Sequence, residues 1–309
     1  MATWNDLLTE FGRTGGAARD EWFTDHLEQA VVEVAALRGD TNVIVYASAF
    51  LQKPSVPPEN VMVMPEDING FMAALNGMDW TKGLTLVLHT PGGVTMATQT
   101  IVEYVRTKFD RLEVIVPTFA MSAGTMIALA SDVIVLGNQS QLGPIDPQLQ
   151  SNGRQQSARA IVEQFEQAHN EILVNPVAAH VWAPILASHG PALLQYAQDQ
   201  LDFSERMVAT WLTKYMMSAA PDPVAEGQRV AKYFNDASLH KSHDKRIGID
   251  EARGQGVNVE KLEENQALQE AVLTLYHVLT ILFEQTQVTK IITSGSGRSW
   301  AKHWVGNAG

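Results

Sequence analysis

The sequence has 309 residues, of which 45% are hydrophobic and 18% are charged, and this ordinary globular composition allows one large core or two modest domains. The formal net charge of -12 repels phosphate backbones and anionic lipid surfaces, so it argues against nucleic acid and anionic membranes as partners. The absence of cysteine excludes disulfides, zinc–thiolate sites and thiol catalysis.

No hydrophobic run indicates a targeting or membrane segment. Residues 1–10 lack the basic and apolar regions of a signal peptide, so we expect a cytoplasmic protein. Residues 112–137 are almost wholly apolar and long enough to cross a bilayer. Because Pro117, Gly124 and Asp132 interrupt this run, it divides naturally into strand, turn, helix and strand, and we expect no membrane span.

Helices and strands alternate in the first half of the chain. Helical spacing of apolar residues predicts a helix over 18–37, and Gly39 follows as a stop signal. Strands are predicted at 42–48, 84–89, 113–117 and 133–136, and further helices at 65–76, 94–109 and 123–130. The strands are almost uniformly apolar, which predicts an α/β fold with a parallel sheet covered on both faces.

The character of the sequence changes after about residue 150. Strand signals nearly vanish, and helical patterns follow at 154–173, 191–217, 222–235 and 263–285. We therefore expect an α/β core over residues 1–150, a helical extension over 151–285 and a Ser/Gly-containing tail over 286–309.

Two glycine-bearing segments follow neighbouring strands. Thr90-Pro91-Gly92-Gly93 comes directly after the strand at 84–89, and such a turn lets backbone N–H groups point at a ligand, although it can equally be a simple tight turn. Ser122 comes after the next strand and opens a helix of small residues, Ala123-Gly124-Thr125. A serine there is most often a helix N-cap, but the two bends together favour a nucleophile at the carboxyl edge of the sheet.

These motifs resemble the Clp protease and signal peptide peptidase A superfamily, which shares the crotonase-like fold. Further stretches look like the serine dehydrogenase proteinase (SDH) family of Clp-fold serine proteinases in particular: 88–93, 122–125 and 141–148, with Trp4-Asn5-Asp6 and His243-Asp244. The resemblance extends from near the start of the chain to about Val259.

The resemblance implies a superhelix of ββα units and hydrolysis of peptide bonds through an acyl-enzyme on Ser122. Gly92, Gly93 and the N–H of Ala123 would form the oxyanion hole. It also implies a homo-oligomer that acts on a peptide or protein substrate. No cofactor is implied, and no lysine motif for pyridoxal phosphate is present.

The general base is left open by the sequence. A serine nucleophile needs a proton acceptor. By the resemblance, Pro144-Ile145-Asp146 lies where the Clp protease has its histidine, and Asp146 occupies or neighbours that position. By the same resemblance, Asp244 matches the third member of the Clp triad. Its neighbour His243 is the best histidine candidate for the base, and His240 is the second. We therefore expect the segment 240–256 to return to the active site. A Ser-Lys dyad would need Lys214 or a lysine from another subunit, because no lysine lies between Ser122 and Lys214. His243 also fits a solvated loop, and Asp146 before Pro147 fits a turn.

The remaining histidines give no site. His89 follows a buried strand and reads as a core residue, and His169, His180 and His189 lack metal-ligand spacing, so we expect no metal.

Two other functions are compatible with the motifs. A crotonase-fold acyl-CoA hydratase, isomerase or hydrolase would use carboxylates, with Asp146 and Glu163 as candidates. A non-catalytic Clp-fold oligomeric scaffold would explain the missing histidine and the missing nearby lysine. Ser122 followed by Ala-Gly favours the proteinase.

Overall fold

The computed structural model describes residues 3–151, 153–190, 192–295 and 297–306, and it divides the chain into two compact units. The first unit holds Met1–Leu142 and Arg246–Gly309, and the second holds Gly143–Lys245. The chain therefore leaves the first unit after Leu142 and returns to it at Arg246, whereas the sequence analysis expected boundaries at 150 and 285.

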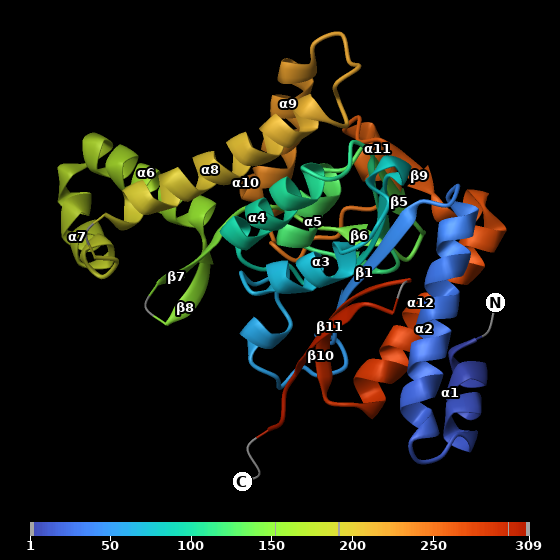
Figure 1. The fold of residues 1–309 in the computed structure, drawn as a ribbon. Helices are drawn as coiled ribbons and strands as arrows, with labels where there is room; N and C mark the ends of the chain where they lie inside the picture. The colour runs from blue at the N-terminus through green and yellow to red at the C-terminus, as the bar shows by residue number, and fades with distance from the viewer. Residues whose placement is uncertain (1–2, 152, 191, 296, 307–309) are drawn as a thin grey trace. The chain divides into compact units, whose positions relative to one another are not determined.

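The first unit is built on a mostly parallel sheet (Figure 1). Within the described residues this sheet has seven strands in the order β11-β10-β1-β2-β3-β5-β9. Neighbours from β1 to β9 pair in parallel, whereas β10 runs antiparallel to both β1 and β11. The strands are β1 (Asn42–Ser48), β2 (Leu84–His89), β3 (Leu112–Val116), β5 (Val133–Leu136), β9 (Val259–Lys261), β10 (Val288–Ser294) and β11 (Ser299–His303). A separate parallel pair joins β4 (Phe119–Ala120) to β6 (Gln141–Leu142).

Helices cover both faces of this sheet, which explains why β10, β1, β2, β3 and β5 are buried at almost every position. Alternate side chains such as Val43, Val45 and Val87 enter a core shared with α1 (Trp4–Arg13), α2 and α12. The long helices α2 (Ala18–Leu37) and α12 (Gln266–Gln285) lie side by side over this face (Figure 1). The intervening side chains are equally buried on the other face, where the helices are α3 (Asp67–Leu75), α4 (Thr95–Arg106) and α5 (Ala123–Leu129). Smaller elements are α11 (Ile249–Gly254) and the 3-10 turns η1 (Pro58–Asn60), η2 (Trp80–Lys82) and η4 (Leu262–Glu264).

The apolar run at 112–137 forms β3, β4, α5 and β5, as its interruptions predicted. Among the described residues one helix, α12, is long and apolar enough to cross a membrane. It is half buried and packs against α2, which is also what the core helix of a soluble protein does.

The second unit is mainly helical, but it begins with a β-hairpin that the sequence analysis missed. Its strands are β7 (Gln148–Ser151) and β8 (Arg154–Ser157), paired antiparallel. The predicted helix start at residue 154 was wrong, because residues Arg154–Ser157 pair with β7 and the helix begins at Ala158. The other elements are α6 (Ala158–Val174), η3 (Pro176–Ala178), α7 (Ala179–Ala187), α8 (Leu193–Lys214), α9 (Pro223–Asn235) and α10 (Ala237–His240).

The C-terminal segment differs most from its prediction. In place of a tail over 286–309, the described residues form β10 and β11, and every residue of β10 is buried. The strand signal was hidden because Lys290 interrupts the apolar pattern. Ser296 and residues 307–309 of the predicted tail lie outside the described residues.

Candidate active site

The two glycine-bearing bends are joined by backbone hydrogen bonds in the first unit. The N–H of Thr90, after β2, donates to the carbonyl of Phe119 at 2.9 Å, and the N–H of Met121 donates to the carbonyl of Thr90 at 3.1 Å. This bridge between Thr90 and Ala120 fixes the chain immediately before Gly92 beside the chain immediately before Ser122. The strand ends thus bring together the two motifs that the sequence analysis paired.

Ser122 has a strained backbone. Its φ is 50° and its ψ is -113°, a conformation that costs a non-glycine residue about 1–3 kcal/mol. The serine stands at the N-cap position of α5, yet its side chain makes no capping hydrogen bond. The N-cap alternative therefore fails, and a partly exposed hydroxyl is held at a sharp strand-to-helix turn, the arrangement that presents a nucleophile.

Gly92 lies in direct contact with the Ser122 turn. A Cβ atom at Gly92 would lie 2.8 Å from both the Ser122 Cβ and the Met121 carbonyl oxygen, and 3.2 Å from the Ala123 nitrogen. Its φ of 106° is also unfavourable for a residue with a side chain. Only glycine lets the two bends approach this closely.

Gly93 lies equally close to the segment before α3. A Cβ atom there would lie 2.3 Å from the carbonyl oxygen of Val63 and 2.4 Å from its nitrogen. Val63 in turn donates its N–H to the Gly92 carbonyl at 2.8 Å and accepts the N–H of Val94 at 2.9 Å. Residues 92–94 are therefore held from one side by Val63 and from the other by the Ser122 turn.

Two backbone N–H groups of the bends are not engaged. Among the described residues, neither the N–H of Gly93 nor that of Ala123 has a hydrogen-bond acceptor, whereas the N–H of Gly92 donates to Thr90 Oγ1 at 3.3 Å. Unpaired donors beside a free hydroxyl are what an oxyanion hole requires.

The second unit contains a histidine–carboxylate pair. His243 Nδ1 lies 2.8 Å from Asp146 Oδ1, and the Asp146 side chain is 1% exposed whereas His243 is about a quarter exposed. The other carboxylate oxygen, Oδ2, accepts hydrogen bonds from the Gln148 side chain at 2.8 Å and from the Ser157 hydroxyl at 2.9 Å. A buried carboxylate fixed in this way orients an imidazole and leaves its Nε2 free to accept a proton.

This pairing differs from the sequence expectation, which matched Asp244 to the orienting aspartate. Asp244 is exposed, and its backbone N–H contacts the Ser242 hydroxyl at 3.3 Å. Gln148 and Ser157, which hold Asp146, were not singled out from the sequence, because they lie on the hairpin that it did not predict.

The other base candidates have different surroundings. His240 is buried, with Nε2 at 2.8 Å from the Tyr233 carbonyl oxygen. Lys214 is exposed at the end of α8, with its ammonium over the Tyr215 ring. Glu163 contacts the Ser238 hydroxyl.

His89 is a core residue at the end of β2. It is buried against the rings of Phe50 and Tyr276, and burial lowers its pKa from 6.5 to about 3. Its Nδ1 lies 2.9 Å from the Thr118 hydroxyl. Within the described parts of the chain, no group of three or more His, Asp or Glu residues could hold a metal ion.

Residues 60–178 match the family model of the ClpP-like SDH-type serine proteinases. The match confirms, over those residues, the resemblance that the motifs predicted. The SDH-type segment contains both bends and Asp146, whereas His243 and the C-terminal hairpin lie beyond it.

Two curated relatives come from Methanocaldococcus jannaschii. The uncharacterized protein MJ0137 is 39% identical over 102 residues, which are 33% of this chain and 34% of that protein. The uncharacterized protein MJ1495 is 30% identical over 109 residues, or 35% of this chain and 37% of that protein. The chain thus matches about a third of the length of each. No solved structure gives a significant match.

Proposed function

We propose that the chain is a serine peptidase that hydrolyses peptide bonds through an acyl-enzyme on Ser122. The observation that carries the proposal is the strained, uncapped Ser122 packed against Gly92, with the unpaired N–H groups of Gly93 and Ala123 beside it. The match of residues 60–178 to a serine proteinase family supports the same reaction class.

In the proposed reaction the Ser122 hydroxyl attacks the scissile carbonyl carbon, and its proton passes to His243 Nε2. The negative charge that develops on the carbonyl oxygen is stabilised by the N–H groups of Gly93 and Ala123, and Gly92 provides the space for their approach. The intermediate collapses to the acyl-enzyme as His243 returns the proton to the departing amine. Water, activated by His243, then releases the acid and restores Ser122.

Asp146 is the orienting carboxylate in this proposal. Its hydrogen bond to His243 Nδ1 selects the tautomer whose Nε2 accepts the serine proton, and it stabilises the imidazolium that forms. Variants of His243 and Asp146 test these two roles.

The crotonase-like alternative has less support. It needs a carboxylate free to act as a base, whereas Asp146 already accepts hydrogen bonds from His243, Gln148 and Ser157. The non-catalytic scaffold gives no reason for the backbone strain at Ser122.

The test is covalent labelling with a fluorophosphonate, followed by mass spectrometry of the modified peptide. We expect the wild-type chain to be labelled on Ser122, and the Ser122→Ala variant to be unlabelled and inactive on fluorescent casein. His243→Asn and Asp146→Asn should each lower the labelling rate by about a thousandfold or more, by analogy with triad variants in general.

The comparison of Asp146→Asn with Asp244→Asn decides which carboxylate orients the base. A large loss from Asp244→Asn and none from Asp146→Asn would reverse the assignment made from the hydrogen bonds. An unlabelled Ser122 in a chain that turns over an acyl-CoA thioester would replace the peptidase by the crotonase-like enzyme.

A further inference from the structure

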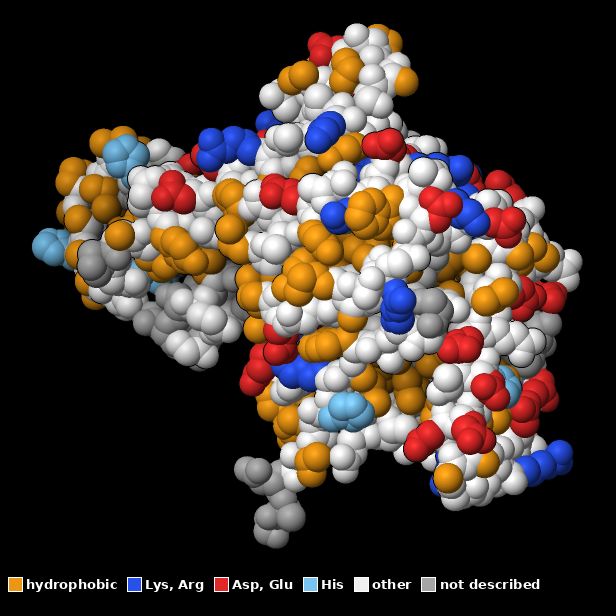
Figure 2. All heavy atoms as spheres, viewed as in Figure 1, with side chains coloured by type: hydrophobic (Ala, Val, Ile, Leu, Met, Phe, Trp, Pro, Cys, Tyr) orange, Lys and Arg blue, Asp and Glu red, His pale blue; other side chains and the backbone are white. Residues whose placement is uncertain are grey.

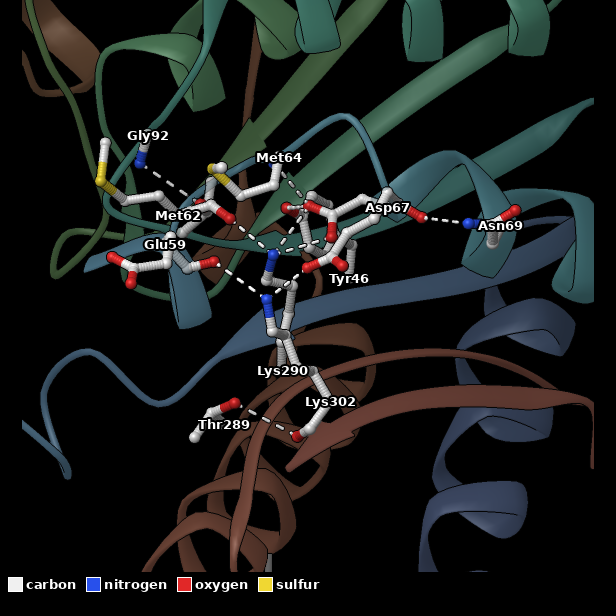
Figure 3. Close-up of polar contacts among 12 residues, drawn as sticks. Tyr46, Glu59, Met62, Met64, Asp67, Asn69, Gly92, Thr289, Lys290 and Lys302 are labelled. Carbon is white, nitrogen blue, oxygen red and sulfur yellow. Dashed lines mark hydrogen bonds and ion pairs between the residues drawn. The ribbon is translucent and has the colours of Figure 1, made fainter. Parts of the chain in front are cut away.

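A buried charged cluster in the first unit joins Lys290, which lies beyond the SDH-type match, to Asp67 within it. The side chains of Lys290 on β10 and Asp67 at the start of α3 are both fully buried and form an ion pair at 2.7 Å (Figure 3). Lys290 is paired in register with Ser48, the last residue of β1, so it lies beside the C-terminal end of β1. Burying two charges is unfavourable unless their hydrogen bonds are satisfied, so the partners of this pair decide its role.

The pair forms hydrogen bonds with the segment before α3 and with Tyr46 on β1. The Lys290 ammonium donates to the Met62 carbonyl at 2.6 Å and to both Asp67 oxygens, at 2.7 and 3.0 Å. Asp67 Oδ2 also accepts the N–H of Met64 at 2.9 Å and the Tyr46 hydroxyl at 2.5 Å. Burial raises the pKa of Tyr46 well above 10, and the nearby Asp67 charge adds to the effect, so the phenol remains a donor.

The residue between the two anchored positions is Val63. The carbonyl before it and the N–H after it are both bound by the Lys290–Asp67 pair, so its own peptide groups have a fixed orientation. Those groups hold the Gly92 carbonyl and the Val94 N–H, and Gly93 lies against the Val63 backbone with no room for a Cβ atom. The Gly92–Gly93 bend in turn contacts Ser122.

We infer that Lys290 is a positioning residue for the oxyanion hole: it fixes Val63 through Met62 and Asp67, and Val63 fixes the Gly92–Gly93 bend. Lys290 touches neither substrate nor nucleophile in this role, which rests on the proposed function of Ser122. A second lysine supports the same segment from β11, because Lys302 contacts the Glu66 carboxylate and lies 3.3 Å from the Glu59 carbonyl oxygen (Figure 3). The C-terminal hairpin thus acts as the support of the active-site bend.

The test compares Lys290→Met with a variant that breaks another buried ion pair. Arg38 and Glu113 form that largely buried pair, which also binds Thr85. Thr85 and Glu113 lie near the starts of β2 and β3, at the opposite ends of these central strands from the two bends. Glu113→Gln should lower the melting temperature but leave the bend intact. All measurements are made on the full chain at a temperature where circular dichroism shows each variant folded.

The first readout is amide hydrogen exchange of the peptides that contain Val63 and Gly92–Val94. We expect Lys290→Met to speed exchange there by about tenfold or more and Glu113→Gln to leave it unchanged. The second readout is the rate of Ser122 labelling by the fluorophosphonate. Lys290→Met should lower that rate by about 10- to 100-fold, and on a peptide substrate it should lower kcat more than it raises KM.

A second variant controls for unfolding caused by an unpaired charge on Asp67. Lys290→Met combined with Asp67→Asn leaves no unpaired charge buried and keeps an oxygen acceptor for Tyr46 and Met64, yet it still removes the donor to Met62. It should show the same faster exchange at the bend and the same slower labelling.

The outcomes separate this inference from the proposed function. Unchanged exchange at residues 92–94 in folded Lys290→Met or in the double variant overturns the inference, whatever the enzyme does. Equal effects of Lys290→Met and Glu113→Gln on labelling would also overturn it, since the effect would then be general destabilisation. A wild-type chain whose Ser122 is never labelled overturns the peptidase proposal, and hydrogen exchange still decides whether Lys290 holds the bend.

Discussion

The buried imidazole of His89 gives the chain a pH-dependent stability. His89 ends β2 shortly before the Gly92–Gly93 bend, and burial lowers its pKa from 6.5 to about 3. Above pH 6.5 the ring is neutral in the folded and unfolded states, so it adds no pH dependence. Between pH 6.5 and about 3 the unfolded chain binds a proton that the folded chain does not, so the free energy of unfolding falls as the pH falls.

We therefore expect His89→Gln to flatten the dependence of stability on pH. Urea unfolding at pH 7, 6, 5 and 4 should show that the wild-type free energy of unfolding declines more steeply than that of the variant. The difference in slope approaches about 1.4 kcal/mol per pH unit, and it is bounded by about 5 kcal/mol in all. The glutamine keeps a hydrogen-bonding group for Thr118. Parallel curves would mean that the folded protein protonates His89 readily.

The sequence predicted individual residues best where one residue type is required locally. Gly92 and Ser122 could be singled out because a strand-to-helix turn that presents backbone donors and a hydroxyl needs those residue types. The pairing of His243 with Asp146 could not be predicted, because the two residues are distant in the sequence. The side chains that hold Asp146 lie on a hairpin with no apolar pattern. Lys290 escaped notice for the same reason, since its partner Asp67 is remote in sequence.

At the scale of elements, the contact between the ends of β2 and β4 depends on Gly92. Gly92→Ala places a methyl group 2.8 Å from the Met121 carbonyl oxygen and from Ser122 Cβ, at a φ of 106°. The bends must separate, so we expect Ser122 labelling to fall by about a hundredfold or more and the stability to fall by about 1–3 kcal/mol.

The matched control for that contact is Gly12→Ala on α1, where no atom lies within 4 Å of the added methyl group. This variant should keep the wild-type labelling rate and gain up to about 1 kcal/mol of stability, since alanine is the better helix former. Wild-type labelling of Gly92→Ala would mean that the close approach of the bends is not needed for the reaction.

Elements of the parallel core were predicted well because each has a strong local pattern. The strands at 42–48, 84–89 and 133–136 are found at the predicted residues, since strands buried on both faces are short, apolar and bounded by polar turns. The strands β7, β8 and β11 were missed because their pairing, rather than their composition, makes them strands, whereas in β10 Lys290 interrupts the apolar pattern.

At the scale of the whole molecule, association between copies remains a prediction, and the second unit offers a surface for it. Hydrophobic side chains gather over α6 and α7 (Figure 2), where Val174 is 88% and Val181 is 65% exposed. Between Glu171 and Asp199 the sequence contains no Asp, Glu, Lys or Arg. Copies with a net charge of -12 repel one another, so an uncharged apolar surface is where association meets the least electrostatic repulsion.

We expect the wild-type chain to sediment as a homo-oligomer and Val174→Asp/Val181→Asp to shift it toward the monomer, because each aspartate would have to be desolvated in the interface. Val224→Asp is the matched control: Val224 is 54% exposed in the same unit, in the first turn of α9, where an acidic side chain is tolerated by the helix dipole.

Sedimentation velocity over a range of concentrations distinguishes the wild-type chain, the double variant and the control. An oligomer that survives the double substitution would place the interface elsewhere, whereas a monomeric wild type would refute association itself. If the double variant is monomeric and still labelled on Ser122, then the reactive bend is complete within one copy.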